Sequence, residues 1–316
     1  MNSVIVTGCA GFIGSHLTER LLRKDFKVTG IDCFTDYYPV EIKRNNLKGF
    51  IGNKNFTFIR RDVIDADLKC LISDSDYIFH LAAQPGVRAS WGQSFEIYIK
   101  NNILGTQRLL EACMKSDIKR LVFASSSSVY GDAKEMPIKE ESVTKPLSPY
   151  GVTKLAAENL CGLYHKNYGI PAVSLRYFTV YGPRQRPDMA FSKFINAVLK
   201  GSPIIIYGDG EQTRDFTYVS DIVEANILAM ERGRNGEIYN IGGGSRISVN
   251  ETIKIIERLA GKRARVEHKE AQSGDMRNTY ADIGKARKDL GYRPETSIES
   301  GLKEMIEYVK NMLRTD

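Results

Sequence analysis

The sequence predicts an α/β protein with a doubly wound parallel sheet, followed by a smaller mixed α/β part. Short apolar runs alternate with amphipathic helical stretches through the first half of the chain, a pattern typical of βαβ units. A glycine-rich turn joins the first apolar run to the first helical stretch. After about residue 177 the chain changes to loops rich in glycine, proline and arginine, which indicates a second structural unit.

Six parallel strands are expected in the first part, at residues 4–6, 27–31, 56–60, 77–81, 120–124 and 172–176. In the second part we expect helices at 191–200, 249–260 and 298–313 and strands at 204–207 and 237–241. Ser248 is the expected N-cap of the second of these helices. We therefore assign residues 1–176 to a first domain, with returning segments near 215–245, and residues 177–316 mainly to a second domain.

The composition predicts a soluble cytoplasmic protein with no membrane or nucleic-acid partner. No apolar run reaches the roughly 18 residues that span a bilayer, and the N-terminus lacks the order of a secretory signal. Five scattered cysteines and four dispersed histidines indicate a reducing compartment and no metal site. The net charge of +7 is not gathered in long basic runs, so we interpret it as a solvated surface, compatible with a local basic pocket for an anionic small molecule.

Gly8, Gly11 and Gly14 form the turn between the first strand and the first helix. Glycines at this spacing let the backbone approach a pyrophosphate, and the helix N-terminus offers it free N–H groups. Asp32 ends the next strand, where its carboxylate can accept hydrogen bonds from both hydroxyls of an adenine ribose and repel a 2′-phosphate. Strand, turn, helix and acid in register predict a dinucleotide site, and Asp32 favours NAD.

A second motif, Tyr150-x-x-x-Lys154, places two polar side chains on one helix face. The lysine charge, together with a cationic nicotinamide, would lower the tyrosine pKa from about 10 so that the phenol acts as a base near neutral pH. Tyr130 and Lys134 repeat this spacing, but a Gly-Asp pair between them favours a loop. We therefore assign catalysis to Tyr150 and Lys154.

The run from Ser125 to Ser128 directly follows the strand at 120–124, at the edge of the sheet where ligands bind. A hydroxyl there can hydrogen-bond to a substrate hydroxyl and share its proton with the phenol. We predict at least one catalytic serine in this run.

These motifs occur in the order of a known family. The glycine turn, Asp32, the segment 80–83 (His-Leu-Ala-Ala), the serine run before Val129-Tyr130-Gly131, the Tyr150–Lys154 pair and the segment 214–216 (Arg-Asp-Phe) span the whole chain. Together they resemble the extended short-chain dehydrogenase/reductases, in the nucleotide-sugar epimerase and dehydratase branch. The resemblance implies a Rossmann fold, tightly held NAD and a homodimer formed through helices at residues 94–116 and 150–168.

The resemblance also implies the cofactor contacts. Asn102 matches the family's cofactor-site asparagine, and Asp62 and Val63 match the pair that contacts adenine. The expected cofactor-binding set is Gly8, Gly11, Phe12, Ile13, Gly14, Asp32, Lys43, Asp62, Val63, Leu81, Ala82, Ala83, Asn102, Tyr150, Lys154 and Tyr177.

The family pattern at the serine run indicates the reaction. The catalytic Ser or Thr of the family lies three residues before the Val of the Val-Tyr-Gly segment, which here is Ser126. The dehydratases carry an Asp-Glu pair at the next two positions and the decarboxylases a Glu at the second, whereas this chain has Ser127 and Ser128. Both side reactions therefore lack their acid, and simple epimerisation remains.

Three further segments resemble the UDP-glucuronate 4-epimerases, at residues 36–40, 84–88 and 184–190. By that pattern Arg186 meets the hexuronate carboxylate, which suits a planar guanidinium, and two other arginines clamp the diphosphate. Thr179 stands where UDP-glucose 4-epimerases usually have Asn, which weakens the neutral-sugar interpretation. The expected substrate-binding set is Arg88, Ser126, Ser127, Ser128, Tyr150, Thr179, Arg186, Tyr207 and the diphosphate pair Arg214 and Arg277.

The resulting hypothesis is an NAD-dependent 4-epimerase that converts UDP-glucuronate to UDP-galacturonate through a transient 4-keto sugar. Three alternatives remain: a 4-epimerase of UDP-glucose or UDP-N-acetylglucosamine, a net oxidoreductase or lyase acting on a nucleotide sugar, and a non-catalytic nucleotide-sensing module. Release of reduced nicotinamide or carbon dioxide would support the second. The third usually loses the tyrosine or the lysine, and this chain keeps both Tyr150 and Lys154.

Overall fold

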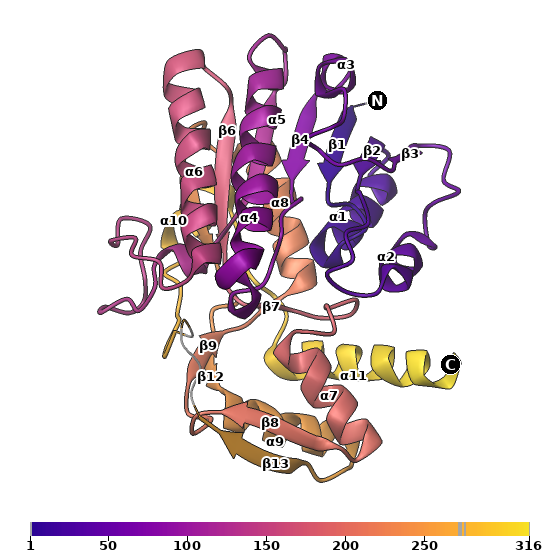
Figure 1. Cartoon of the computed structure of the whole chain (residues 1–316), viewed down its shortest axis with the longest axis vertical. Helices are drawn as coiled ribbons and strands as arrows, with labels where there is room; N and C mark the ends of the chain where they lie inside the picture. Colours follow the sequence, from indigo (N-terminus) through magenta and orange to yellow (C-terminus); the bar gives the residue numbers. More distant parts are fainter. Residues whose placement is uncertain (1, 271–273, 275, 316) are drawn as a thin grey trace.

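A computed structural model describes residues 2–270, 274 and 276–315. Within these residues, a seven-stranded parallel sheet has the order β11-β6-β5-β4-β1-β2-β3 (Figure 1). Its strands are β1 (Ser3–Thr7), β2 (Lys27–Ile31), β3 (Phe56–Ile59), β4 (Tyr77–His80), β5 (Arg120–Ser126), β6 (Ala172–Tyr177) and β11 (Ile238–Ile241). The predicted doubly wound sheet is confirmed, and the run predicted at 237–241 supplies its seventh strand.

Helices cover both faces of this sheet because its strands are apolar on both sides. Along β1, Val4 and Val6 belong to one buried core and Ile5 to the other, since alternate side chains of a strand point to opposite faces. The first core includes residues of α1 (Phe12–Arg23), α2 (Val40–Leu47), α8 (Val219–Arg232) and α10 (Gly284–Leu290), and the second includes residues of α3 (Leu68–Ser73), α5 (Gly105–Cys113) and α6 (Pro149–Tyr168). None of the described helices is long and apolar enough to cross a membrane.

The segment expected as one helix at 94–116 is helical without a break from Phe95 to Cys113, and its middle is π-helical. It contains α4 (Phe95–Tyr98), the π-helical turn η3 (Ile99–Leu104) and α5, which ends at Cys113. Short 3₁₀ turns occupy η1 (Arg88–Ser90), η2 (Gly92–Ser94) and η4 (Ser127–Val129). The π turn takes one more residue per turn than an α-helix, so it changes the side-chain directions within this stretch.

The order of the strands reverses between β4 and β1, which is where a doubly wound sheet binds ligands. The glycine turn follows β1 at this point. Gly8 has a φ of +74°, and a Cβ on Gly14 would lie 2.1 Å from the Gly8 carbonyl oxygen, so neither position accepts a side chain. The turn therefore presents bare backbone, and α1 begins directly after it.

A buried ion pair joins α6 to the sheet. Glu158 accepts hydrogen bonds from Arg176 Nε (3.0 Å) and Nη2 (2.6 Å) and from the Ser125 hydroxyl (2.6 Å). The Arg176 and Glu158 side chains are 4% and 1% exposed. Arg176 Nη1 donates to the Tyr130 hydroxyl and to the Glu140 carbonyl. Because both charges are paired and hydrogen-bonded, the cluster can lie inside the core.

The rest of the chain forms a smaller mixed α/β part at one end of the sheet (Figure 1). It contains α7 (Ala190–Lys200), α9 (Val249–Ala260), α11 (Ile298–Thr315) and the strand pairs β7 (Val180–Tyr181) with β10 (Thr217–Tyr218), β8 (Pro203–Tyr207) with β13 (Arg265–Lys269), and β9 (Thr213–Asp215) with β12 (Arg246–Ser248). The predicted cap of α9 is confirmed, because Ser248 and Glu251 form a capping box. The domain boundary at residue 176 stays a prediction.

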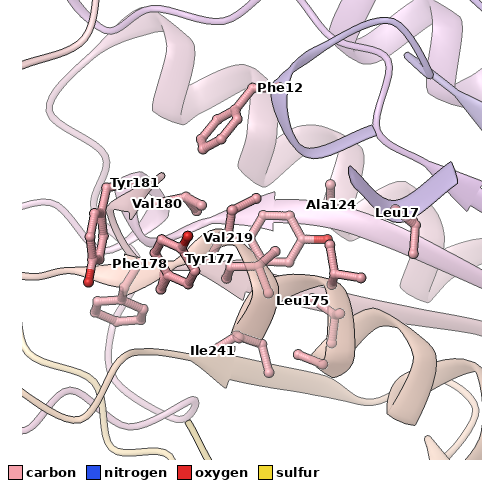
Figure 2. Packing of buried hydrophobic residues seen from close by; sticks show 14 of the residues in the cluster. Phe12, Leu17, Ala124, Leu175, Tyr177, Phe178, Val180, Tyr181, Val219 and Ile241 are labelled. Carbon is pink, nitrogen blue, oxygen red and sulfur yellow. The ribbon is translucent and has the colours of Figure 1, made fainter. Parts of the chain in front are cut away.

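One continuous core connects the two parts. Figure 2 shows Phe178, which follows β6, in the same cluster as Val219 of α8 and Ile241 of β11. The Tyr181 ring of this cluster meets Phe191 of α7 edge to face, with ring centres 5.3 Å apart. Shared packing therefore holds the smaller part beside the carboxyl ends of the strands.

Candidate active site

A cavity of about 210 Å³ opens at the carboxyl ends of β1, β2, β4 and β5. Backbone of the glycine turn, side chains from the loops after these strands and the first turns of α6 form its walls. The predicted site residues that line it are Gly8, Gly11, Phe12, Ile13, Gly14, Asp32, Lys43, Asp62, Val63, Leu81, Ala82, Ala83, Tyr150, Lys154, Tyr177 and Arg186. The structure therefore brings together residues from many separate segments of the chain.

The glycine turn and α1 form one end of the cavity. Gly11 caps α1 without a side-chain hydrogen bond, and the first helical turn carries no acidic residue. The first N–H groups of α1 are therefore suited to an anionic group such as a pyrophosphate. Because the glycines keep the turn compact and without side chains, this end of the cavity fits a dinucleotide.

Asp32 lies next to the glycine turn, at the end of β2. Its carboxylate accepts backbone hydrogen bonds from Ala10 (3.2 Å) and Phe34 (2.9 Å). The Lys43 ammonium lies 3.8 Å from Asp32 Oδ1 and donates to the Thr35 hydroxyl at 2.9 Å. Lys43 therefore compensates part of the Asp32 charge and lines the cavity itself.

Tyr150 and Lys154 come from the first two turns of α6 and line the same cavity. Ser148 caps this helix by accepting a hydrogen bond from Gly151 N at 3.1 Å, and Pro149 occupies its first position. The cap determines where α6 begins, so it also places the phenol one turn before the lysine on the same face.

Burial and neighbouring groups determine the charge states of this pair. Burial raises the pKa of the Tyr150 hydroxyl, while a hydrogen bond with Ser126 and the charge of Arg186 lower it. Burial lowers the pKa of Lys154 from 10.5 to about 8, and the ammonium lies 4.8 Å from the centre of the Phe123 ring. Burial is the largest of these effects, so the pKa of Tyr150 lies above its ordinary value of 10 in the cofactor-free protein, and the lowered pKa expected from the sequence is not found there.

Tyr130, the other tyrosine with a lysine four residues later, has a structural environment. It precedes Gly131, whose φ of +64° ends any helical path. Its hydroxyl donates to Asn240 Oδ1 at 2.7 Å and accepts from Arg176, and its side chain is 1% exposed. The predicted loop at 130–134 is confirmed, and Tyr130 belongs to the polar cluster around Arg176.

Asn102 differs from the rest of the predicted cofactor set, since it is 1% exposed and does not line the cavity. Its side chain accepts from Gln84 N (2.7 Å) and donates to the Gln84 carbonyl (3.1 Å) and the Thr153 hydroxyl (2.9 Å). Asn102 thus joins the loop after β4 to α6, while the neighbouring Asn101 lines the cavity. Any effect of Asn102 on a cofactor would pass through that loop.

Arg186 is the predicted sugar-binding residue that lies in the cavity wall with Tyr150. Its Nε and Nη2 donate to the two carboxylate oxygens of Asp188, each at 2.9 Å. The Arg186 side chain is 17% exposed. The cavity wall therefore holds a positive group beside the phenol.

The two predicted diphosphate arginines lie on adjacent segments. Thr213 of β9 forms a bridge with Asn278, and Arg214 Nη1 donates to the Arg277 carbonyl at 3.1 Å. Arg277 forms a bidentate ion pair with Asp209, with both N–O distances at 2.8 Å. Neither arginine lines the cavity itself, so a diphosphate that both hold would lie outside its described walls.

The remaining predicted substrate residues do not line the cavity as described: Arg88, Ser126, Ser127, Ser128, Thr179 and Tyr207. Ser126 nevertheless reaches the Tyr150 hydroxyl through a hydrogen bond, and its Oγ accepts from Ser128 N at 3.1 Å. The Arg88 guanidinium lies 4.3 Å from the centre of the Tyr207 ring. This contact joins the loop after β4 to β8, across the two parts of the molecule.

The cavity wall also contains residues that the sequence did not assign to the site: Ile31, Cys33, Thr35, Tyr37, Tyr38, Arg61, Pro85, Asn101, Gly105, Ala124 and Ser125. Tyr37 and Tyr38 carried a signal, because they belong to the segment 36–40 that resembles UDP-glucuronate 4-epimerases. Most of the others neighbour a predicted residue in sequence. Over the described part of the chain, no group of three or more His, Cys, Asp or Glu side chains could hold a metal ion.

The chain matches known proteins along nearly its whole length. A family model described as GDP-mannose 4,6 dehydratase matches residues 5–305. The chain belongs to this family of extended short-chain dehydrogenase/reductases. A UDP-glucuronate 4-epimerase of Thermodesulfobacterium geofontis is 42% identical over 98% of this chain and 97% of its own length. An uncharacterised UDP-glucose epimerase of Bacillus subtilis (strain 168) is 49% identical over 98% of each chain.

A solved structure of the same short-chain dehydrogenase/reductase family shows the same fold. UDP-glucuronic acid 4-epimerase from Bacillus cereus, in complex with UDP-glucuronic acid and NAD, has a TM-score of 0.96 and 46% identity, covering 98% of this chain and 99% of that chain. The family resemblance that the motifs predict is therefore confirmed.

Tyr150→Phe is expected to abolish turnover, because it removes the titrating hydroxyl and keeps the ring, which meets Tyr98 edge to face. Binding of UDP should remain, so turnover and UDP affinity are measured together. Tyr130→Phe is the matched control. It removes buried hydrogen bonds and should lower the free energy of unfolding by about 1–3 kcal/mol, but it should leave turnover unchanged. An active Tyr150→Phe beside an inactive Tyr130→Phe would reverse the assignment of the base.

Lys154→Met should stabilise the cofactor-free protein at pH 7 while abolishing turnover. The pKa of Lys154 is about 8 in the folded protein against 10.5 otherwise. The unfolded chain therefore binds more protons between these values, and stability rises with pH across that window. At pH 7 the buried charge costs up to about 3 kcal/mol, which methionine removes. Urea unfolding of Lys154→Met and the wild type is compared at pH 7 and pH 10. The gain in the free energy of unfolding should be smaller at pH 10, and a gain that is the same at both pH values contradicts this account.

Proposed function

We propose that this protein is an NAD-dependent 4-epimerase that converts UDP-glucuronate to UDP-galacturonate. The observation that carries the proposal is the place of Arg186, a mostly buried guanidinium in the same cavity wall as Tyr150 and Lys154. A carboxylate on the sugar would give this guanidinium a second ionic partner, beside Asp188 and next to the base. The relatives from Thermodesulfobacterium geofontis and Bacillus cereus, both named for this reaction, support the proposal.

NAD fits the residues around the glycine turn. The N–H groups of α1 would hold its pyrophosphate, Asp32 its adenine ribose, and Asp62 and Val63 its adenine. When bound, NAD would supply the hydride acceptor for C4′ of the sugar and return the hydride to the opposite face. Asp32 favours NAD over NADP because its carboxylate would meet a 2′-phosphate of like charge.

Three residues would handle the proton at the sugar O4′. Tyr150 takes this proton as the sugar is oxidised and gives it back when the 4-keto sugar is reduced. Ser126 hydrogen-bonds with Tyr150 and would orient O4′ toward it. Lys154 stabilises the phenolate as long as the lysine itself carries its proton. The lysine is mostly protonated below its pKa of about 8.

The sugar must turn over between the two hydride transfers while the nucleotide stays bound. We propose that residues 177–316 provide most of this substrate site, with Arg214 and Arg277 holding the diphosphate about which the 4-keto hexose rotates. Ser127 and Ser128 offer no carboxylic acid at the positions where the dehydratases and decarboxylases carry one. The arrangement therefore supports epimerisation rather than loss of water or carbon dioxide.

A 4-epimerase of neutral UDP-hexoses is the second candidate. The Arg186–Asp188 pair is already compensated in charge without a substrate, so the cavity does not require an acidic sugar. The Bacillus subtilis relative, named as a UDP-glucose epimerase, also favours this candidate. The two candidate functions differ in whether turnover depends on Arg186.

We further propose a cytoplasmic homodimer that pairs through α6 and the α4–α5 stretch. Both segments carry exposed apolar side chains, which are Ile97, Ile99, Leu104, Val152 and Leu163, with exposures of 49%, 43%, 38%, 47% and 54%. Burying such side chains against a second copy would remove apolar area from water. The five cysteines are all free thiols, which fits a reducing compartment.

Arg186→Ala should reduce the catalytic efficiency with UDP-glucuronate by roughly 30- to 4,000-fold, because losing one side of a buried charge pair costs about 2–5 kcal/mol. UDP-glucuronate and UDP-glucose are compared side by side without added cofactor, and the 4-epimers formed are quantified. UDP affinity should barely change. Near-full activity of Arg186→Ala on UDP-glucuronate, or wild-type turnover of UDP-glucose alone, contradicts the proposal and favours the neutral-sugar enzyme.

Sedimentation should give a species of twice the chain mass of 35.5 kDa. Leu163→Glu on α6 should shift it to the single-chain mass, because a charge would enter the apolar contact. Val143→Glu is the control, since Val143 is 82% exposed outside these helices and should leave the dimer intact. A single-chain mass for the wild type would exclude the dimer.

A further inference from the structure

The guanidinium of Arg186 uses only one edge on Asp188. Nε and Nη2 donate to the two oxygens of this carboxylate, each at 2.9 Å, in the bidentate arrangement that makes strong pairs. A guanidinium carries five N–H donors, so the hydrogens of Nη1 and the second hydrogen of Nη2 remain. They form a second edge of the same fork geometry, which can receive another carboxylate.

Asp188 is held from a different segment of the chain. The Tyr37 hydroxyl donates to Asp188 Oδ2 at 3.4 Å, and the Arg186 guanidinium carbon lies 5.9 Å from the centre of the Tyr37 ring. Both Tyr37 and Arg186 line the cavity. The loop after β2 therefore supports the side chains of the loop that follows β7.

The Tyr37 side chain packs closely against the loop after β4. Gly86 has a φ of +103°, and a Cβ there would lie 2.2 Å from the Tyr37 hydroxyl oxygen. Tyr98 donates to the Gly86 carbonyl at 2.9 Å and meets the Tyr150 ring edge to face, with centres 6.3 Å apart. A continuous series of contacts thus connects Asp188 to the residue assigned as the base.

The backbone of the Arg186 loop is held without Asp188. His16 Nε2 contacts the Pro183 carbonyl at 2.9 Å. The Gln185 side chain donates to the Val180 carbonyl and accepts from Ser192 N, each at 3.0 Å. A change at Asp188 should therefore alter the direction of the Arg186 side chain rather than the course of the loop.

We propose that Asp188, supported by Tyr37, is a positioning residue that sets the preference for acidic sugars. It orders Arg186 before the substrate arrives, so that the free edge of the guanidinium faces the C5 carboxylate of a UDP-hexuronate. A side chain that is already ordered in the free protein loses less entropy on binding, so more of the interaction free energy appears as affinity. This inference rests on the proposed function, because it assumes that Arg186 meets that carboxylate.

The sign of the effect separates positioning from charge compensation. If Asp188 only compensated the charge of Arg186, removing its negative charge would strengthen the binding of an acidic sugar. If Asp188 positions Arg186, the same change weakens that binding. Neither account predicts a change for UDP-glucose, which lacks the carboxylate.

The test measures affinities by titration calorimetry on NAD-loaded protein that carries Tyr150→Phe, so that no turnover occurs. Asp188→Asn should weaken the binding of UDP-glucuronate about tenfold and leave the affinities for UDP-glucose and UDP unchanged. Tyr37→Phe should cause a smaller loss of affinity for UDP-glucuronate alone. On an Arg186→Ala background, Asp188→Asn should change nothing further, because coupled residues are not additive.

Asp209→Asn is the matched control, because Asp209 holds Arg277 in the same bidentate way. All three ligands contain the diphosphate, so this variant should change their affinities alike. Unchanged or tighter UDP-glucuronate binding by Asp188→Asn overturns the proposal, and so does an equal loss for UDP-glucose. If the wild type forms no UDP-galacturonate, the proposed function is wrong. The role of Asp188 is still tested in that case, by the ratio of the affinities for UDP-glucuronate and UDP-glucose.

Discussion

The buried pair of Glu158 and Arg176 is the interaction on which the active-site geometry depends. Tyr150, Lys154 and Glu158 recur every four residues along α6, so they share one face of the helix. Glu158 joins that face to the ends of β5 and β6 through Ser125 and Arg176. Rotating α6 would separate two buried charges at a cost of about 3–5 kcal/mol. The helix therefore keeps Tyr150 and Lys154 toward the cavity, even though burial penalises the charge of Lys154.

Local patterns are enough to predict the sheet and the glycine turn with Asp32, because the residues of each pattern lie close together in sequence. The bounds of α9 match the prediction, since a capping box at Ser248 begins it and Gly261, in the left-handed conformation, ends it. β5 continues two residues beyond its predicted end. Ser125 and Ser126 extend it by pairing with β6, although polar side chains at a strand end resemble the start of a loop.

The sugar side could not be predicted in the same way, because it depends on side chains that meet across the chain. Tyr37 and Asp188 are 151 positions apart, and no local pattern connects them. Asn102 illustrates the same limit: its residue type suits a cofactor contact, but its donors and acceptors are used on Gln84 and Thr153. Which of these partners a polar side chain takes follows only from the packing of loops after separate strands.

Helix α1 contacts two parts of the candidate site at once. Its first turn borders the cofactor end of the cavity, and its next turns hold the loop at 182–189, with His16 on the Pro183 carbonyl and Glu19 on Arg184 at 2.9 Å. Burial lowers the pKa of His16 to about 4, so this contact keeps a neutral imidazole at physiological pH. The loop at 182–189 is consequently not an independent module. A grafted loop without Arg184 would lose the contact with Glu19, whereas the contact with His16 uses a main-chain carbonyl and needs only the same backbone course, so an exchange of this loop has to be matched to α1.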